Sequence, residues 1–91
     1  MQVNEAVFPK EYSMNLVFSS DQYQVVEYPE LDAFELVNTR RGTGVYIDGE
    51  VARVFRSSME GLFAQSAPSE EDVDGVIGNF DALMTQPLVY H

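Results

Sequence analysis

Residues 33–63, AFELVNTRRGTGVYIDGEVARVFRSSMEGLF, contain the change of hydrophobic period that decides the fold. From Ala33 to Arg40 successive side chains alternate between two faces, which is the pattern of a β-strand. Gly42 and Gly44 supply the backbone freedom that a hairpin turn requires, and residues 45–47 then predict a short strand. The first half of this stretch therefore predicts two strands of an antiparallel hairpin.

The second half of the stretch predicts a helix. At 100° per residue its apolar residues fall on a single stripe, formed by Val51, Val54, Phe55, Leu62 and Phe63. Asp48 is suited to cap the N-terminus of this helix, because a negative side chain is favourable at the positive end of the helix dipole. We therefore expect a helix that begins directly after the last strand.

Two more strands are predicted upstream of this stretch. Met14, Leu16 and Phe18 alternate with other residues and are expected on one face of a first strand. Residues 23–28 are rich in β-branched and aromatic side chains and predict a second strand, which Pro29 ends. Four short strands in succession are typical of an antiparallel meander.

A second helix is predicted after Pro68. Ser69 is suited to cap it, with Asp72 three residues later as the other member of a capping box. The expected apolar stripe of this helix contains Val73, Val76, Ile77, Phe80, Leu83 and Met84. Pro87 ends the helix, and residues 88–90 are expected to form an edge strand or a packed tail.

The order β-β-β-β-α-α predicts an α+β fold, with a four-stranded antiparallel meander and two amphipathic C-terminal helices packed on one face. A chain of 91 residues can fill one hydrophobic core and not two. Residues 1–13 show no periodic apolar face, so we expect a flexible N-terminal extension there. Residues 14–91 are expected to form the single domain.

Composition argues against several classes of protein. The chain has fifteen acidic residues against five Lys and Arg, a net charge of −10, which disfavours direct binding to the phosphate backbone of a nucleic acid. It has no cysteine for a disulfide framework, and no apolar run approaches the length of a membrane span. We therefore expect a cytoplasmic protein with no membrane contact.

Residues suited to catalysis are scarce, and we predict no enzyme, no cofactor and no metal site. His91 is the sole histidine and is the last residue, where it is poorly held for proton transfer. Glu27 and Glu35 are the only plausible acids, and each is expected to face solvent from its strand. The acidic residues at 70–74 do not match the spacing of a calcium loop and suit a helix N-terminus instead.

The candidate binding surface is a group of arginines within seventeen residues, namely Arg40, Arg41, Arg53 and Arg56. Two interpretations remain open. These side chains either pair within the chain, with Glu60 and the acidic second helix, or form a basic patch for an acidic or phosphorylated partner. Tyr46 is the expected aromatic anchor of such a contact, since Arg and Tyr are enriched among residues that dominate interface energetics.

The strand face opposite Leu16 and Phe34 is more apolar than a solvated face would be. It carries Val17, Val37 and Tyr46 in the alternating pattern. Either the strand pairing is irregular, or a second subunit covers this face. A homodimer is therefore one of the expected forms of the protein.

Three segments resemble a small bacterial family known as domain of unknown function 3567, found mainly in beta-proteobacteria: residues 23–29 (YQVVEYP), 33–38 (AFELVN) and 80–88 (FDALMTQPL). The likeness extends from Met14 to the C-terminus. Asn38 and Thr39 stand where the family pattern has an Asp-Lys pair. The resemblance implies no activity, cofactor or catalytic residue.

We therefore expect a non-enzymatic protein–protein interaction module, with a protein partner that the sequence does not identify. The alternative is an acidic mimic of nucleic acid, which would occupy the basic site of a DNA- or RNA-binding protein through the carboxylates of the second helix. A third hypothesis, a small hydrolase or isomerase, requires a deep pocket at Glu27 or Glu35.

Overall fold

The computed structural model describes residues 13–65 and 67–87, so the predicted extension up to residue 12 and the predicted tail at 88–90 lie outside it. The elements follow in the order β1 (Asn15–Ser19), β2 (Tyr23–Tyr28), the 3₁₀ helix η2 (Pro29–Leu31), β3 (Ala33–Asn38), β4 (Thr43–Ile47), α1 (Gly49–Gln65), α2 (Glu70–Gly78), the 3₁₀ helix η3 (Asp81–Leu83) and β5 (Gln86–Pro87). No helix in this described part is both long and apolar enough to cross a membrane.

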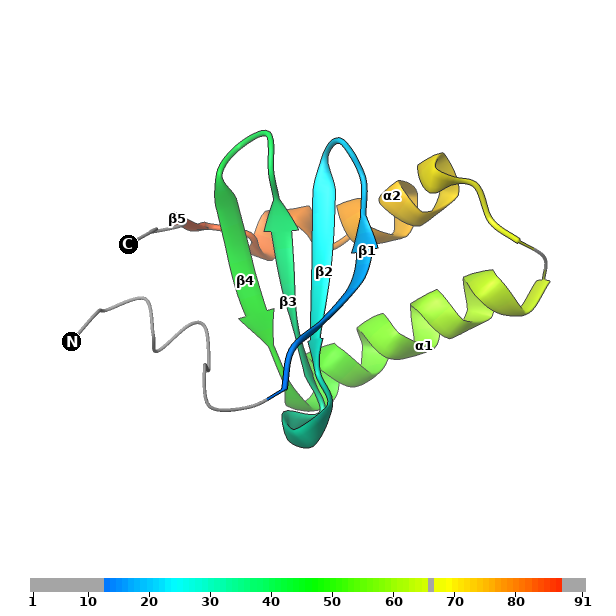
Figure 1. Cartoon of the computed structure of the whole chain (residues 1–91), viewed down its shortest axis with the longest axis horizontal. Coiled ribbons are helices and arrows are strands. Elements are labelled where there is room, and N and C mark those ends of the chain that lie inside the picture. Colours follow the sequence, from blue (N-terminus) through cyan, green and yellow to red (C-terminus); the bar gives the residue numbers. More distant parts are fainter. Residues whose placement is uncertain (1–12, 66, 88–91) are drawn as a thin grey trace.

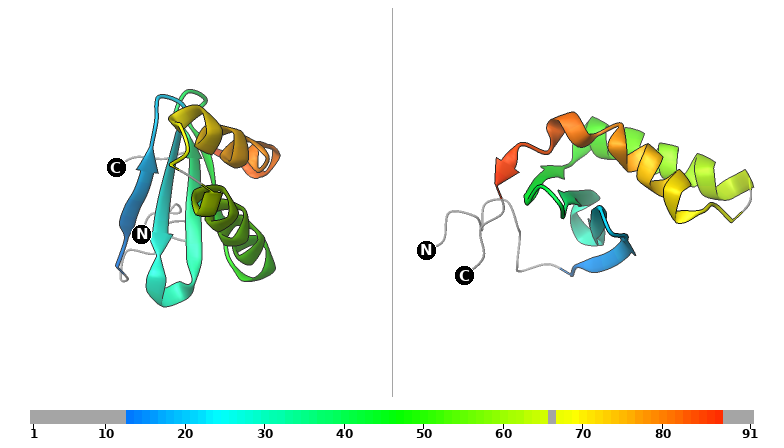
Figure 2. Two further views of the ribbon diagram at one scale, coloured as in Figure 1. Left: turned by 90° about the vertical axis from the view of Figure 1, so that its right-hand side faces the viewer. Right: turned by 90° about the horizontal axis from the view of Figure 1, so that it is seen from above.

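The strands form one sheet in the order β1-β2-β3-β4-β5, and every neighbouring pair is antiparallel. β1 to β4 are the predicted meander, and the two-residue β5 adds a short fifth strand beside β4. Both helices lie on the same side of the sheet (Figure 1, Figure 2). The predicted α+β architecture is therefore confirmed.

β1 departs from its predicted pattern at Val17. Leu16 is paired with Val26, and Phe18 is paired with Val25, so the register shifts by one residue between them. Because successive residues of β2 point to opposite faces, Leu16 and Phe18 also lie on opposite faces of the sheet. The prediction that they share a face is wrong, because a β-bulge places one extra residue between them.

The predicted turn between β3 and β4 is confirmed. Gly42 has a φ angle of 68°, in the left-handed region that favours glycine. Its N–H donates to the carbonyl oxygen of Asn38 at 2.9 Å, which closes the turn. Gly44 lies instead within β4, where its backbone is buried and paired with Val37.

α1 packs on the sheet through a different face from the one predicted. Ala52 and Phe55 are buried, while Met59 and Leu62 are partly buried against the same core. Three members of the predicted stripe are instead exposed, namely Val51, Val54 and Phe63. The C-terminal half of α1 extends past the β1 edge of the sheet, so the strands do not cover it (Figure 1).

α2 begins as predicted and ends earlier. The hydroxyl of Ser69 accepts a hydrogen bond from the N–H of Asp72, whose carboxylate accepts one from the N–H of Ser69, so the capping box is confirmed. The helix ends at Gly78, and η3 follows, whereas the stripe predicted a helix that continues to Met84. Met84 is nevertheless buried.

The core lies between the sheet and the two helices. Three aromatic rings cross it in edge-on contacts: Phe34 of β3 meets Phe55 of α1 with ring centroids 5.0 Å apart, and Phe55 meets Phe80 at 5.2 Å. The buried cluster consists of Tyr23, Val25, Phe34, Leu36, Ile47, Ala52, Phe55, Val73, Ile77 and Met84.

Candidate functional site

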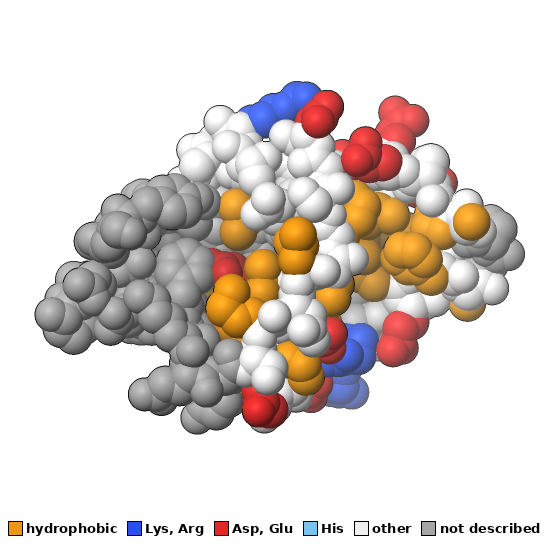
Figure 3. All heavy atoms as spheres, in the orientation of Figure 1, with side chains coloured by type: hydrophobic (Ala, Val, Ile, Leu, Met, Phe, Trp, Pro, Cys, Tyr) orange, Lys and Arg blue, Asp and Glu red, His pale blue; other side chains and the backbone are white. Residues whose placement is uncertain are grey.

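A groove of 220 Å³ lies between the β1–β2 side of the sheet and α1. Its lining residues are Val17, Phe18, Val25, Glu27, Phe34, Phe55, Arg56, Met59, Glu60 and Phe63. In Figure 3 hydrophobic side chains gather to the right of β1, over the space between the sheet edge and the helices. The walls of the groove are therefore mainly apolar, and the charged groups among these lining residues are two carboxylates and one guanidinium.

The groove opens where α1 runs beyond the edge of the sheet. Phe63, in the last part of the helix, is 53% exposed, and Val17, at the bulge of β1, is 48% exposed. The bulge brings Val17 into the lining, beside Phe18 on the helix-facing side of the sheet. Two elements far apart in the sequence thus present apolar side chains to the same hollow.

β1 is an edge strand of unusual composition. In residues 13–65 and 67–87 it is paired with β2 on one side, and no strand is paired with its other side. Its five residues carry no charge and no proline, although these are the common devices that protect sheet edges. Met14 and Leu16 are more than half exposed. The edge therefore offers backbone groups and apolar side chains together.

Arg56 is the predicted binding residue that the structure places at the groove. Its guanidinium donates to Oε2 of Glu27 at 3.2 Å and to Oδ1 of Asp32 at 2.6 Å. The same group lies 4.9 Å from the centre of the Phe34 ring, within the range of a cation–π contact. Two carboxylates thus compensate the positive charge of Arg56.

Glu60 lies one helical turn after Arg56 and is exposed. Within the described residues it makes no hydrogen bond or ion pair, so the predicted pairing of the arginines with Glu60 is not seen there. Its carboxylate lines the groove as a negative charge that no side chain in the described part of the chain compensates.

The predicted arginines lie at opposite ends of the sheet. Arg40 and Arg41 are in the turn between β3 and β4, whereas Arg53 and Arg56 are near the start of α1. In Figure 3 the basic side chains accordingly appear in two separate places, at the top and the bottom of the view. Arg53 pairs with Glu50 on the same helix. The four arginines therefore do not form one continuous patch.

Tyr46, the predicted anchor, lies on the sheet face turned away from the helices. It is half-buried, is paired with Glu35 across the strands, and has its ring centroid 5.9 Å from that of Tyr28. Val37 lies on this same face and is only 7% exposed within the single chain. The irregular pairing that the sequence left open is found in β1, while β2, β3 and β4 pair in continuous register.

Glu35 and Glu27 both differ from their predicted solvent-facing positions. Glu35 is 3% exposed, and its Oε1 accepts a hydrogen bond from the Tyr28 hydroxyl at 3.3 Å. Burial raises the pKa of Glu35 to about 7. Glu27 is half-buried and faces Arg56. The prediction is wrong because Glu27 lies on the helix side of the sheet against Arg56, and Glu35 is buried beside Tyr28 on the other side.

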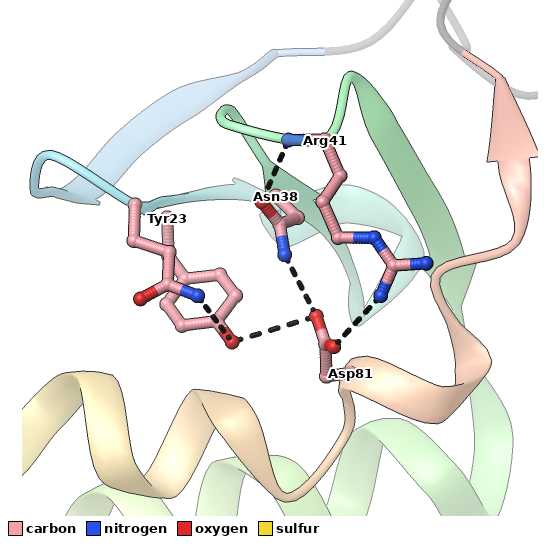
Figure 4. Close-up of polar contacts among 5 residues, drawn as sticks. Tyr23, Asn38, Arg41 and Asp81 are labelled. Atoms are coloured by element: carbon pink, nitrogen blue, oxygen red, sulfur yellow. Dashed lines mark hydrogen bonds and ion pairs between the residues drawn. The ribbon is translucent and has the colours of Figure 1, made fainter.

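Asp81 connects η3 to the start of β2 and the end of β3 through a polar network that the sequence did not indicate (Figure 4). Its Oδ1 accepts hydrogen bonds from the Tyr23 hydroxyl at 3.4 Å and from Nδ2 of Asn38 at 3.0 Å. Its Oδ2 accepts from Arg41 at 3.5 Å. Desolvation and the nearby Asp81 carboxylate raise the pKa of Tyr23. The one available signal was the polar Asn38 at an inward position of β3.

The acidic start of α2 has structural uses. Asp72 belongs to the capping box, and Asp74 accepts a hydrogen bond from the hydroxyl of Ser20 at 2.8 Å. Among the described residues, no group of three or more His, Asp or Glu side chains is arranged to hold a metal ion.

Comparison with known proteins shows where the chain belongs. The model of the family described as "Protein of unknown function (DUF3567)" matches residues 14–91. Protein BTH_I0359 of Burkholderia thailandensis, a beta-proteobacterium, is 38% identical over 86 residues, which cover 86% of this chain and 100% of that protein. No solved structure matches the chain. The resemblance found in the sequence is confirmed: the chain belongs to the DUF3567 family.

Proposed function

We propose that this protein is a non-catalytic interaction module that binds an extended segment of another protein along β1. The single observation that carries this proposal is the juxtaposition of an apolar groove with a strand edge that no other strand pairs with in residues 13–65 and 67–87. An extended segment can add to such an edge through main-chain hydrogen bonds, while alternate side chains enter pockets beside it.

The size of the groove supports a side-chain site. Its volume is 220 Å³, whereas typical small-molecule sites have volumes of about 300–1,000 Å³. Its exposed apolar side chains, Val17 and Phe63, stand on the two walls, one on the strand and one on the helix. Apolar residues of a bound strand would be enclosed between them, which is the source of affinity in this type of recognition.

The two carboxylates that the enzyme hypothesis requires do not lie together in the groove as free acids or bases. Glu27 lines the groove, but its carboxylate is ion-paired with Arg56. Glu35 lies on the other face of the sheet and does not line the groove. These placements favour binding over proton transfer. Arg56 is then a residue that fixes Glu27 and one wall of the groove, and the predicted Arg40 and Arg41 lie away from it.

A matched pair of variants tests the proposal. Val17→Asp places a charge in the groove, whereas Val51→Asp places the same charge at an exposed valine of α1 that does not line it. Tagged full-length chains would be used to capture partners from the native cell, and circular dichroism would establish that both variants fold. We expect Val17→Asp to lose partners that wild type and Val51→Asp retain. Equal partner sets for the two variants would contradict the proposed site.

A further inference from the structure

The charges around the groove do not balance. Arg56 is the one cation among the described lining residues. Its guanidinium is bound to the carboxylate of Glu27, which also lines the groove, and to that of Asp32, which lies outside the lining. Glu60 adds a third carboxylate at the rim. Among the described residues, the two carboxylates of the lining and the neighbouring Asp32 carry three negative charges against the one positive charge of Arg56, beside an otherwise apolar hollow.

Glu60 is the member of this group that is open to a partner. It is exposed, and within residues 13–65 and 67–87 it has no hydrogen bond or ion pair. It lies on the same helix as Phe63, which is half exposed on the groove wall. A long side chain with an apolar stem and a cationic end could pack its stem on Phe63 and pair its charge with the carboxylate of Glu60.

From this charge pattern we infer that the segment bound along β1 is cationic, with alternate apolar residues directed into the groove and a Lys or Arg placed against Glu60. The inference rests on the proposed function and names the chemistry of its partner. The net charge of −10 acts in the same direction, since it attracts a basic segment at long range and repels a second copy of this chain.

Two peptide pools test the inference with the full-length chain. Both contain peptides of about seven residues, the length of an ordinary strand, with Val, Ile, Leu or Phe at alternate positions. The intervening positions hold Lys, Arg or Thr in the cationic pool and Asp, Glu or Thr in the acidic pool. Amide chemical shifts in NMR spectra would report where each pool binds, and titration would give its affinity.

We expect the cationic pool to shift the amides of β1 and of the second half of α1, with an affinity that falls as salt rises. Glu60→Gln should weaken this binding about two- to fivefold, the size expected for one partly exposed ion pair. The matched control is Glu50→Gln, which removes the same charge about 15 Å away along the helix axis. It should leave the affinity unchanged.

The outcomes separate the two proposals. If the acidic pool binds at β1 as tightly as the cationic pool, or if Glu60→Gln behaves like Glu50→Gln, the inferred cationic partner is overturned while strand addition at β1 stands. If neither pool shifts the amides of β1, the proposed function itself is overturned, and the inference fails with it.

Discussion

Tyr28 on β2 donates a hydrogen bond from its hydroxyl to Oε1 of Glu35 on β3, with 3.3 Å between the two oxygens. The other carboxylate oxygen of Glu35, Oε2, is buried and has no hydrogen-bond partner among the described residues. Burial raises the pKa of this carboxyl from its ordinary 4.5 to about 7, and the hydrogen bond from Tyr28 opposes the increase. A buried carboxyl in this state links the stability of the fold to pH.

Glu35→Gln should remove this pH dependence. Because the folded-state pKa is raised, the stabilisation from the protonated carboxyl is fully present below about pH 4.5 and is lost as pH rises through about 7. Urea unfolding at several pH values would measure this effect. Between pH 4 and pH 8 the unfolding free energy of the variant should increase relative to that of wild type by up to about 3 kcal/mol. Glu60→Gln, at an exposed glutamate, serves as the control. A constant difference between Glu35→Gln and wild type would contradict this assignment.

Tyr28→Phe tests the hydrogen bond itself. The variant leaves the buried carboxylate of Glu35 without its donor, which should cost about 1–3 kcal/mol of unfolding free energy at pH 8. The pKa of Glu35 should rise further, because the donated hydrogen bond lowers it. The loss should therefore be smaller at pH 5, where the carboxyl is protonated. In the Glu35→Gln background the pH-dependent part should vanish, and its persistence would show that another group titrates.

Asn38→Asp should destabilise the fold by about 2–4 kcal/mol, because it replaces a buried donor by a carboxylate facing Asp81. Asp81→Asn in the same chain restores a donor–acceptor pair with the roles exchanged. The double variant should recover part of the loss, and a double-mutant cycle in urea measures that coupling. Additive effects would show that the Asn38–Asp81 contact carries no coupling energy.

Phe55→Ala and Phe63→Ala compare two phenylalanines of α1 that both belong to the predicted stripe. Phe55 is 1% exposed and contacts two other aromatic rings, so its loss should cost about 3–5 kcal/mol. Phe63 is 53% exposed, and its loss should change the unfolding free energy by about 0.5 kcal/mol or less. Thermal or urea unfolding distinguishes these values. A large loss at Phe63 would mean that the groove is closed in solution.

The strands and their order could be predicted because alternation and turn residues act locally. The bulge at Val17 could not, since Leu16, Val17 and Phe18 are consecutive apolar residues and fit either register. The inward face of α1 was similarly ambiguous. Val51 and Val54 extend the apolar stripe, and only the packing of Ala52 and Phe55 against the sheet selects the neighbouring face.

The candidate site depends on contacts that local patterns do not contain. Arg56 and Glu27 are 29 residues apart in the sequence, and Asp81 and Asn38 are 43 residues apart. The sequence identified Arg56 as a surface cation, but its two carboxylate partners follow from the tertiary fold. The burial of Glu35 likewise depends on tertiary packing. The alternating pattern predicts the side of the sheet on which Glu35 lies, but it does not predict whether that side is buried.

Arg56→Ala and Arg53→Ala separate a tertiary ion pair from a local one on the same helix. Arg56 bridges Glu27 and Asp32 and lies over the Phe34 ring, with its side chain 34% exposed. Arg53 pairs only with Glu50 within the described residues, and both of these side chains are about 70% exposed. We expect Arg56→Ala to lower the unfolding free energy by about 1–2 kcal/mol, and Arg53→Ala by about 0.5 kcal/mol or less. High salt should reduce the effect of Arg56→Ala only in part, because its contact with the ring is screened less than an exposed ion pair. Urea unfolding at low and high salt measures both free-energy changes and their salt dependence. Equal losses of unfolding free energy for the two variants would show that the contacts of Arg56 do not stabilise the groove wall.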